Sequence, residues 1–280
     1  MKEETETMLT VVTATVDPGK TLKYWSSWRK MATVPFRLIL VVGSPKPEEL
    51  MLDDEVVAQL WVGDEVVFRP IDGTVNAFLA GLGVVEEAGG CEDGKVVACF
   101  HDDMEIMQAG WDAMVKGVFS LYPKTVLAGF GGGKGLGSED IYNVPYNPMQ
   151  LARQGFVSNM RDAEAHGRRG VKIEKLACTD GFAMIGRDRF LLEAFQLFNA
   201  KMVKHHAYDS WTGALARQAG LDCMLIPVAC HHAGGVTAVG SEAYQSWARS
   251  QRRNGDMDFW EEAHRAMYEE CRGILPFRVE

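Results

Sequence analysis

Short apolar runs alternate with longer segments of helical periodicity in the first hundred residues. The apolar or β-branched runs are Thr10–Val16, Phe36–Val42, Glu65–Phe68 and Val96–Phe100. Runs of this length and composition predict strands, most of them buried. Helices are predicted between them at Lys20–Met31 and Gly73–Ala88. Strands that alternate with helices in this way are typical of an α/β fold whose parallel sheet has helices on its faces.

The second half of the chain predicts shorter elements in a less regular order. Strands are predicted at Lys124–Ala128, Lys172–Leu176, Gly181–Ile185 and Cys223–Val228, and helices at Arg187–Phe198 and Tyr208–Ala219. Between them, residues 129–137 read GFGGGKGLG. Long glycine-rich loops are often active-site lids, so we predict a flexible loop that closes over a bound ligand.

Residues 241–272 form a polar, aromatic-rich segment with helical periodicity that is interrupted near Asn254-Gly255. We therefore predict one domain over residues 1–240 and a helical tail over residues 241–280. The tail is expected to pack on the domain or to form a contact in a homo-oligomer.

Composition limits the classes of function. The 280 residues include 47% hydrophobic and 24% charged residues, which is ordinary for a globular protein. The net charge of -9 argues against a broad nucleic-acid-binding face, because a phosphate backbone would be repelled. The acidic N-terminus lacks the pattern of a signal peptide, and no apolar run approaches the length of a membrane span. We expect a cytoplasmic protein without stable membrane insertion.

Acidic and imidazole side chains follow two of the predicted strands. His101, Asp102 and Asp103 come directly after one, and His231-His232 follow another. Ligands of open α/β sheets bind outside the carboxyl ends of the strands. Two adjacent carboxylates there would attract a divalent cation such as Mg²⁺ or Mn²⁺. The alternative is an acidic turn with both carboxylates in water, and this stretch alone does not decide between them.

Five motifs in a fixed order resemble a known family. After the first strand come FHDDMEI followed by GW, then DGFAMIGRDRF, HHAYDSW and finally CHHAGG. Together they resemble the GT-A fold glycosyltransferases of the broad family-two-like group, over residues 10–237. The resemblance implies a Rossmann-like nucleotide-binding sheet with a mixed acceptor-side half. It also implies transfer of a sugar from a nucleotide-diphosphate sugar, with a UDP-sugar as first candidate, to an acceptor hydroxyl with inversion.

The resemblance implies roles for individual residues. Asp103 would bind Mn²⁺ or Mg²⁺, together with either His231 or His232, which the sequence does not distinguish. Asp209 would deprotonate the acceptor hydroxyl, and its place at a helix start favours the ionised form but lowers its basicity. The remaining site residues, which would contact the nucleotide or face the sugar, are Thr13, Thr15, Asp102, Asp180 and Gly181.

Departures from the family pattern keep other functions open. Trp211 stands where the family often has a second acid, and Leu79 stands where it often has Asn. These departures suggest a non-catalytic protein that binds a nucleotide sugar or a glycan. A sugar nucleotidyltransferase is a further alternative, and Asp209 could instead cap its helix. The acceptor is open among glycan, protein, lipid and modified nucleic acid.

Overall fold

An eight-stranded sheet forms the centre of the protein, with the strand order β11-β14-β6-β13-β4-β1-β2-β3. The computed structural model describes residues 8–88, 95–137, 155–201, 206–234, 241–250 and 259–280. In one half of the sheet all neighbours are parallel, in the order 3-2-1-4 of nucleotide-binding Rossmann-like sheets. Its strands are β1 (Thr10–Thr15), β2 (Arg37–Ser44), β3 (Glu65–Pro70) and β4 (Val96–His101).

The other half of the sheet is mixed. Strand β13 runs antiparallel to both β4 and β6, whereas β14 is parallel to β6 and antiparallel to the edge strand β11. The bounds are Thr125–Gly129 for β6, Glu174–Leu176 for β11, Ala183–Arg187 for β13 and Asp222–Leu225 for β14. The predicted α/β class, with a Rossmann-like sheet and a mixed second half, is confirmed.

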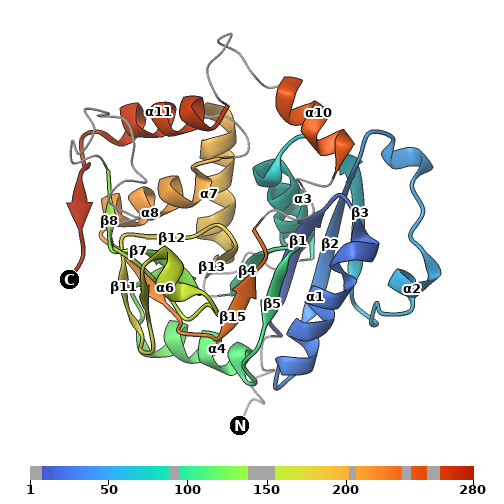
Figure 1. The fold of residues 1–280 in the computed structure, drawn as a ribbon, viewed down its shortest axis with the longest axis horizontal. Helices are drawn as coiled ribbons and strands as arrows, with labels where there is room; N and C mark the ends of the chain where they lie inside the picture. Colours follow the sequence, from blue (N-terminus) through green and yellow to red (C-terminus); the bar gives the residue numbers. More distant parts are fainter. Residues whose placement is uncertain (1–7, 89–94, 138–154, 202–205, 235–240, 251–258) are drawn as a thin grey trace.

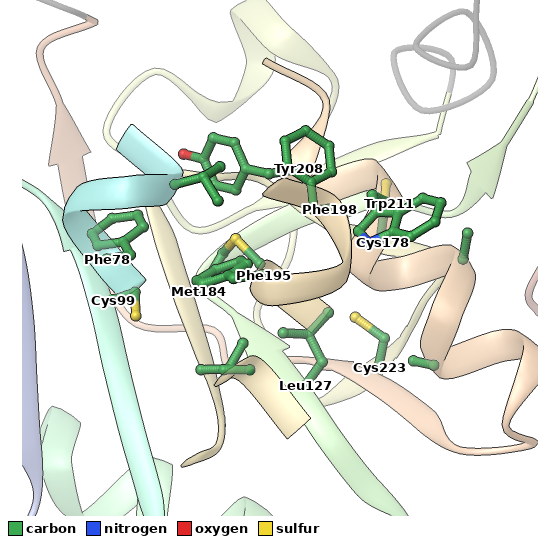
Figure 2. Packing of buried hydrophobic residues seen from close by; sticks show 14 of the residues in the cluster. Phe78, Cys99, Leu127, Cys178, Met184, Phe195, Phe198, Tyr208, Trp211 and Cys223 are labelled. Atoms are coloured by element: carbon green, nitrogen blue, oxygen red, sulfur yellow. The ribbon is translucent and has the colours of Figure 1, made fainter. Parts of the chain in front are cut away.

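Helices cover both faces of the sheet (Figure 1). Successive side chains of a strand point to opposite faces, so Val11 and Val12 belong to different hydrophobic clusters. The cluster with Val12 contains α3 (Thr74–Glu87), α7 (Asp188–Lys201), α8 (Tyr208–Gln218) and α11 (Phe259–Cys271). Figure 2 shows part of it, where aromatic rings of α3, α7 and α8 pack together. The cluster with Val11 contains α1 (Pro18–Met31) and α4 (Trp111–Leu121).

Short elements complete the fold around the sheet. They include the helical segments at Pro47–Glu49, α2 (Asp54–Val57) and α6 (Ala163–His166), and the strands β5 (Met104–Ile106), β9 (Phe156–Ser158), β10 (Arg168–Arg169), β12 (Cys178–Thr179) and β15 (Cys230–His232). Within the described ranges, none of the helices has the length and apolarity needed to cross a membrane.

The C-terminal segment is attached to the domain. Helix α10 covers Glu242–Ser250, and α11 places Ala263, Met267 and Cys271 in the same hydrophobic cluster as α8. Strand β16 (Phe277–Arg278) then pairs antiparallel with β8 (Gly135–Leu136). Helix α11 and strand β16 thus contact earlier parts of the described chain. The division into a domain and a tail, and the use of the tail as an oligomer contact, stay predictions. The break predicted near Asn254-Gly255 lies outside the described residues.

The prediction that residues 129–137 form a flexible lid is wrong. Gly131–Gly133 form strand β7, which is buried and pairs antiparallel with both β9 and β12. A Cβ atom at Gly132 would lie 2.2 Å from the carbonyl oxygen of Cys178. These glycines therefore allow close backbone approach, which sequence composition does not distinguish from mobility.

We expect Gly132→Ala to destabilise the protein by about 2–4 kcal/mol, because the added Cβ must displace backbone rather than a flexible side chain. Gly83→Ala in α3 is the matched control, since a Cβ there meets nothing within 4 Å. The control should be neutral or stabilising by up to about 1 kcal/mol. Urea unfolding of the two variants measures both effects, and equal stabilities would contradict the packing explanation.

Candidate functional site

A cavity of about 220 Å³ lies at the carboxyl ends of the four parallel strands. Its apolar walls include Val41, Ala77 and Phe78, and its polar rim includes Thr15 and the ion pair of Arg69 with Asp72. His101, Asp102 and Asp103 at the end of β4 also line the cavity, as does His232. This is the edge at which open α/β sheets bind their ligands.

Three of these side chains converge as a potential metal-binding group: His101, Asp103 and His232. The antiparallel pairing of β15 with β5 places His232 opposite Met104, next to Asp103. The Nε2 atom of His232 lies 3.1 Å from Oδ1 of Asp103 and 3.4 Å from Nδ1 of His101. An ion about 2.1–2.2 Å from ligands at right angles would hold them about 3 Å apart, so these residues fit a divalent cation. Two imidazoles and one carboxylate suit Mn²⁺ better than Mg²⁺, which prefers oxygen.

The pKa values of His101 and His232 are shifted in opposite directions. Burial and the neighbouring His232 lower the pKa of His101 to about 4, although Asp103 acts in the opposite direction. Burial also favours neutral His232, but its hydrogen bond to Asp103 and the charges of Asp103, Asp180 and Asp102 raise its pKa overall. His101 is therefore neutral at pH 7, which is the form that can bind a metal.

Asp209 lies at the start of α8 and does not cap it. The N-cap residue is Ala207, in a left-handed conformation with φ 65°, and no side chain caps the helix. The carboxylate instead accepts hydrogen bonds from the backbone N–H groups of Ser210 (2.7 Å) and Gly181 (3.2 Å). Burial and the neighbouring Asp180 raise the pKa of Asp209 to about 7. The backbone donors at the helix start lower this pKa, in the expected direction, but burial outweighs them.

The contribution of Asp209 to the free energy of unfolding should fall as the pH rises from about 4 to 7, because Asp209 binds its proton more tightly when folded than when unfolded. Asp209→Asn removes this penalty. The melting-temperature difference between variant and wild type should increase by about 2–6 °C from pH 5 to pH 8, after a discount for partial exposure of the side chain. Because the loss of hydrogen bonds in the variant lowers its melting temperature at both pH values, the comparison between them isolates the effect of ionisation. The exposed Asp53→Asn is the control, and a pH-independent difference would contradict the prediction.

The other predicted site residues lie in three places. Thr15, Asp102 and Asp103 line the cavity. Thr13 donates a hydrogen bond from its hydroxyl to the Phe100 carbonyl inside the sheet and is not among the cavity-lining residues. Asp180 and Gly181 lie beside Asp209 instead.

The structure distinguishes between the two adjacent histidines. His232 contacts Asp103, whereas His231 alternates to the other side of β15 and lies outside the group that could hold a metal among the described residues. The ring of His232 also stacks on Phe182, with centroids 5.0 Å apart. Sequence reasoning left the ligand role open, because alternation can be assigned only once the strand pairing is known.

Several residues of the site were not assigned from sequence. The acidic motif by itself indicates no ligand role for His101, although this residue lies two residues before Asp103 at a strand end. Arg69, near the end of β3, and Asp72, just after it, also line the cavity. The rule that carboxyl ends of parallel strands meet at one edge could have found them. Tyr208, whose hydroxyl lies 2.7 Å from Nε2 of His101, has no sequence pattern around it that indicates a role in the site.

Comparisons with known proteins assign no family. No family model matches the sequence, and no curated protein sequence gives a significant match. Among solved structures, a 4-diphosphocytidyl-2C-methyl-D-erythritol synthase aligns with a TM-score of 0.45 and 8% identity, over 87% of this chain and 97% of its own. A nucleoside-diphosphate-sugar pyrophosphorylase from Vibrio cholerae aligns with a TM-score of 0.42 and 11% identity, over 86% and 100% of the two chains. Both scores are below 0.5, and we base no functional inference on them.

Proposed function

We propose that the protein is a metal-dependent glycosyltransferase that moves a sugar from a nucleotide-diphosphate donor to an acceptor hydroxyl. The observation that carries the proposal is the pairing of two sites. A cavity with a potential metal-binding group lies at the carboxyl edge of the sheet, and a carboxylate with a raised pKa, Asp209, lies on the adjoining helix. The motif resemblance of residues 10–237 to GT-A glycosyltransferases agrees with this reading.

The donor side is assigned to the cavity. Its apolar walls would take the nucleoside, and Thr15 and Asp102 would contact its hydroxyl groups. His101, Asp103 and His232 would hold a divalent cation, which when bound would offset charge on the leaving diphosphate. A UDP-sugar is the first donor to test.

The acceptor side is assigned to Asp209. A general base is most effective when its pKa lies near the working pH, and the pKa of Asp209 is raised to about 7. Gly181 holds one carboxylate oxygen through its N–H group, and Phe182 next to it stacks on His232. The segment at residues 180–182 thus connects the base to the metal-binding group. An acceptor hydroxyl within hydrogen-bond reach of Asp209 would lie at the junction of the two sites.

A nucleotidyltransferase is the second candidate, and the charge of the cavity disfavours it. A nucleoside triphosphate needs cationic groups to offset its charge. Of the described residues that line the cavity, only Arg69 carries a guanidinium or ammonium group, and it is already paired with Asp72 at 2.5 Å. The potential metal-binding group is otherwise compatible with either reaction.

The departure at Trp211 does not support a non-catalytic protein. Trp211 is 2% exposed, and its Nε1 donates a hydrogen bond to the Ala194 carbonyl of α7. This position of α8 therefore faces the core rather than the site. Keeping a carboxylate with a raised pKa costs stability, which is more readily explained by a catalytic role than by binding alone.

The products of donor turnover test the proposal. Purified protein with Mn²⁺ would be incubated with a panel of UDP-, GDP-, CDP- and dTDP-sugars, with simple alcohol or glycan acceptors and without them. A glycosyltransferase releases a nucleoside diphosphate from the sugar donor. A nucleotidyltransferase, given a nucleoside triphosphate and a sugar 1-phosphate in a separate incubation, releases pyrophosphate. Parallel panels with Mg²⁺ and Fe²⁺ are needed, because two imidazoles and a carboxylate also suit Fe²⁺. Pyrophosphate release, or nucleotide-sugar binding without turnover under every condition, would contradict the proposal.

A further inference from the structure

Tyr208 connects the potential metal-binding group to the helix that carries Asp209. Its hydroxyl lies 2.7 Å from Nε2 of His101 and 3.5 Å from the carbonyl oxygen of Gly181. The side chain is 5% exposed, and edge-on contacts with Phe78 and Phe195 hold the ring at centroid distances of 6.3 and 6.1 Å. Figure 2 shows its hydroxyl directed away from Phe198 and Trp211.

The contacts of the hydroxyl with His101 and with the Gly181 carbonyl bear on where the proton of His101 lies. A phenol has one proton to donate, and the carbonyl of Gly181 can only accept. If the hydroxyl donates to Gly181, it accepts from His101, which then carries its proton on Nε2. The lone pair of Nδ1 is thereby left facing His232 and Asp103, where a cation would lie. The other tautomer would place a proton on Nδ1 and block it as a ligand.

We propose that Tyr208 is a positioning residue that fixes the tautomer and orientation of His101 and thereby sets the affinity for the divalent cation. This inference rests on the metal-binding group of the proposed function. Metal-binding histidines characteristically donate their second ring N–H to a fixed acceptor, and loss of that acceptor weakens metal binding by 10–100-fold. Here the acceptor is supplied from α8, 107 residues further along the chain.

Gly181 gives independent support for the role of the hydroxyl. A Cβ atom at this position would lie 2.4 Å from the Tyr208 hydroxyl oxygen, so a side chain there would displace it from His101. Gly181 therefore leaves the space that the hydrogen bond requires. Gly181→Ala should reproduce the effect of removing the hydroxyl while keeping the hydroxyl in the protein.

Metal affinity is measured without donor or acceptor, by the electron paramagnetic resonance signal of free Mn²⁺ in a titration. Tyr208→Phe and Gly181→Ala should each weaken Mn²⁺ binding by about 10–100-fold relative to wild type. Tyr122→Phe, at the C-terminal end of α4, is the matched control and should bind like wild type. A Tyr208→Phe variant that melts lower but binds Mn²⁺ as tightly as wild type would show a structural role only and would overturn the proposal.

The tautomer itself is read by ¹⁵N NMR of the metal-free protein, with the His101 signals assigned by their loss in His101→Gln. Wild type should show a proton on Nε2 of His101, and Tyr208→Phe should shift the population toward the Nδ1-protonated form. An Nδ1 proton in wild type, or an unchanged spectrum in the variant, would overturn the proposal. Wild type that binds none of Mn²⁺, Mg²⁺ and Fe²⁺ would overturn both this role and the metal-dependent function. Equal binding by wild type and Tyr208→Phe would overturn the role of Tyr208 alone.

Discussion

Asp209→Asn is expected to lower kcat by about a hundredfold or more while donor affinity stays near that of wild type. The reason is that Asn has nearly the shape of Asp but cannot accept the acceptor's proton, and a general base contributes about 10²–10⁴-fold. The Asp209 carboxylate lies outside the cavity lining, so the change leaves the donor side intact. Steady-state kinetics with the donor found in the product assay measure the effect.

The pH dependence provides a second and independent readout of Asp209. In wild type, kcat/KM should rise with pH and level off above about 7, because the base must be ionised and the pKa of Asp209 is raised to about 7. Asp209→Asn should lose this dependence. Asp222→Asn is the control, since this carboxylate pairs with Lys175 on the edge of the sheet. An Asn variant with unimpaired turnover would exclude Asp209 as the base.

Asp103→Asn is expected to abolish the contribution of Mn²⁺ to nucleotide binding, with a loss of about a hundredfold or more in Mn²⁺ affinity. Asp103 is 2% exposed and is the one carboxylate of the potential metal-binding group. Without its charge the two imidazoles alone bind Mn²⁺ weakly, because Mn²⁺ favours oxygen ligands. The fold should persist, since the Asp103 carbonyl that accepts from Ala233 N–H is unchanged.

Calorimetric titration of UDP with and without Mn²⁺ measures this effect. The matched control is Glu105→Gln, two residues further along β5, whose carboxylate is partly exposed and lies 3.5 Å from Arg161. The control should keep the Mn²⁺-dependent affinity of wild type. If Asp103→Asn also keeps it, His101, Asp103 and His232 are not the metal site.

Much of the sheet could be predicted from the sequence, because strand composition and helical periodicity are local properties. The runs Thr10–Val16 and Val96–Phe100 correspond closely to β1 and β4. The position of Asp102 and Asp103 at the cavity could also be predicted, because both follow a strand and ligands of open α/β sheets bind at the carboxyl ends of the strands. The prediction for the glycine-rich residues 129–137 was wrong, because glycine suits both mobile loops and close strand contacts.

Only the tertiary structure decided how the site residues combine. The sequence by itself established an α/β protein with carboxylates at a strand end and the residue types for metal binding and proton transfer. Strand pairing between β5 and β15 selected His232 over His231, and packing of α8 placed Tyr208 against His101. The raised pKa of Asp209 comes from burial and from Asp180, 29 residues earlier in the chain. Proximity and burial depend on contacts between distant segments, which local periodicity does not specify.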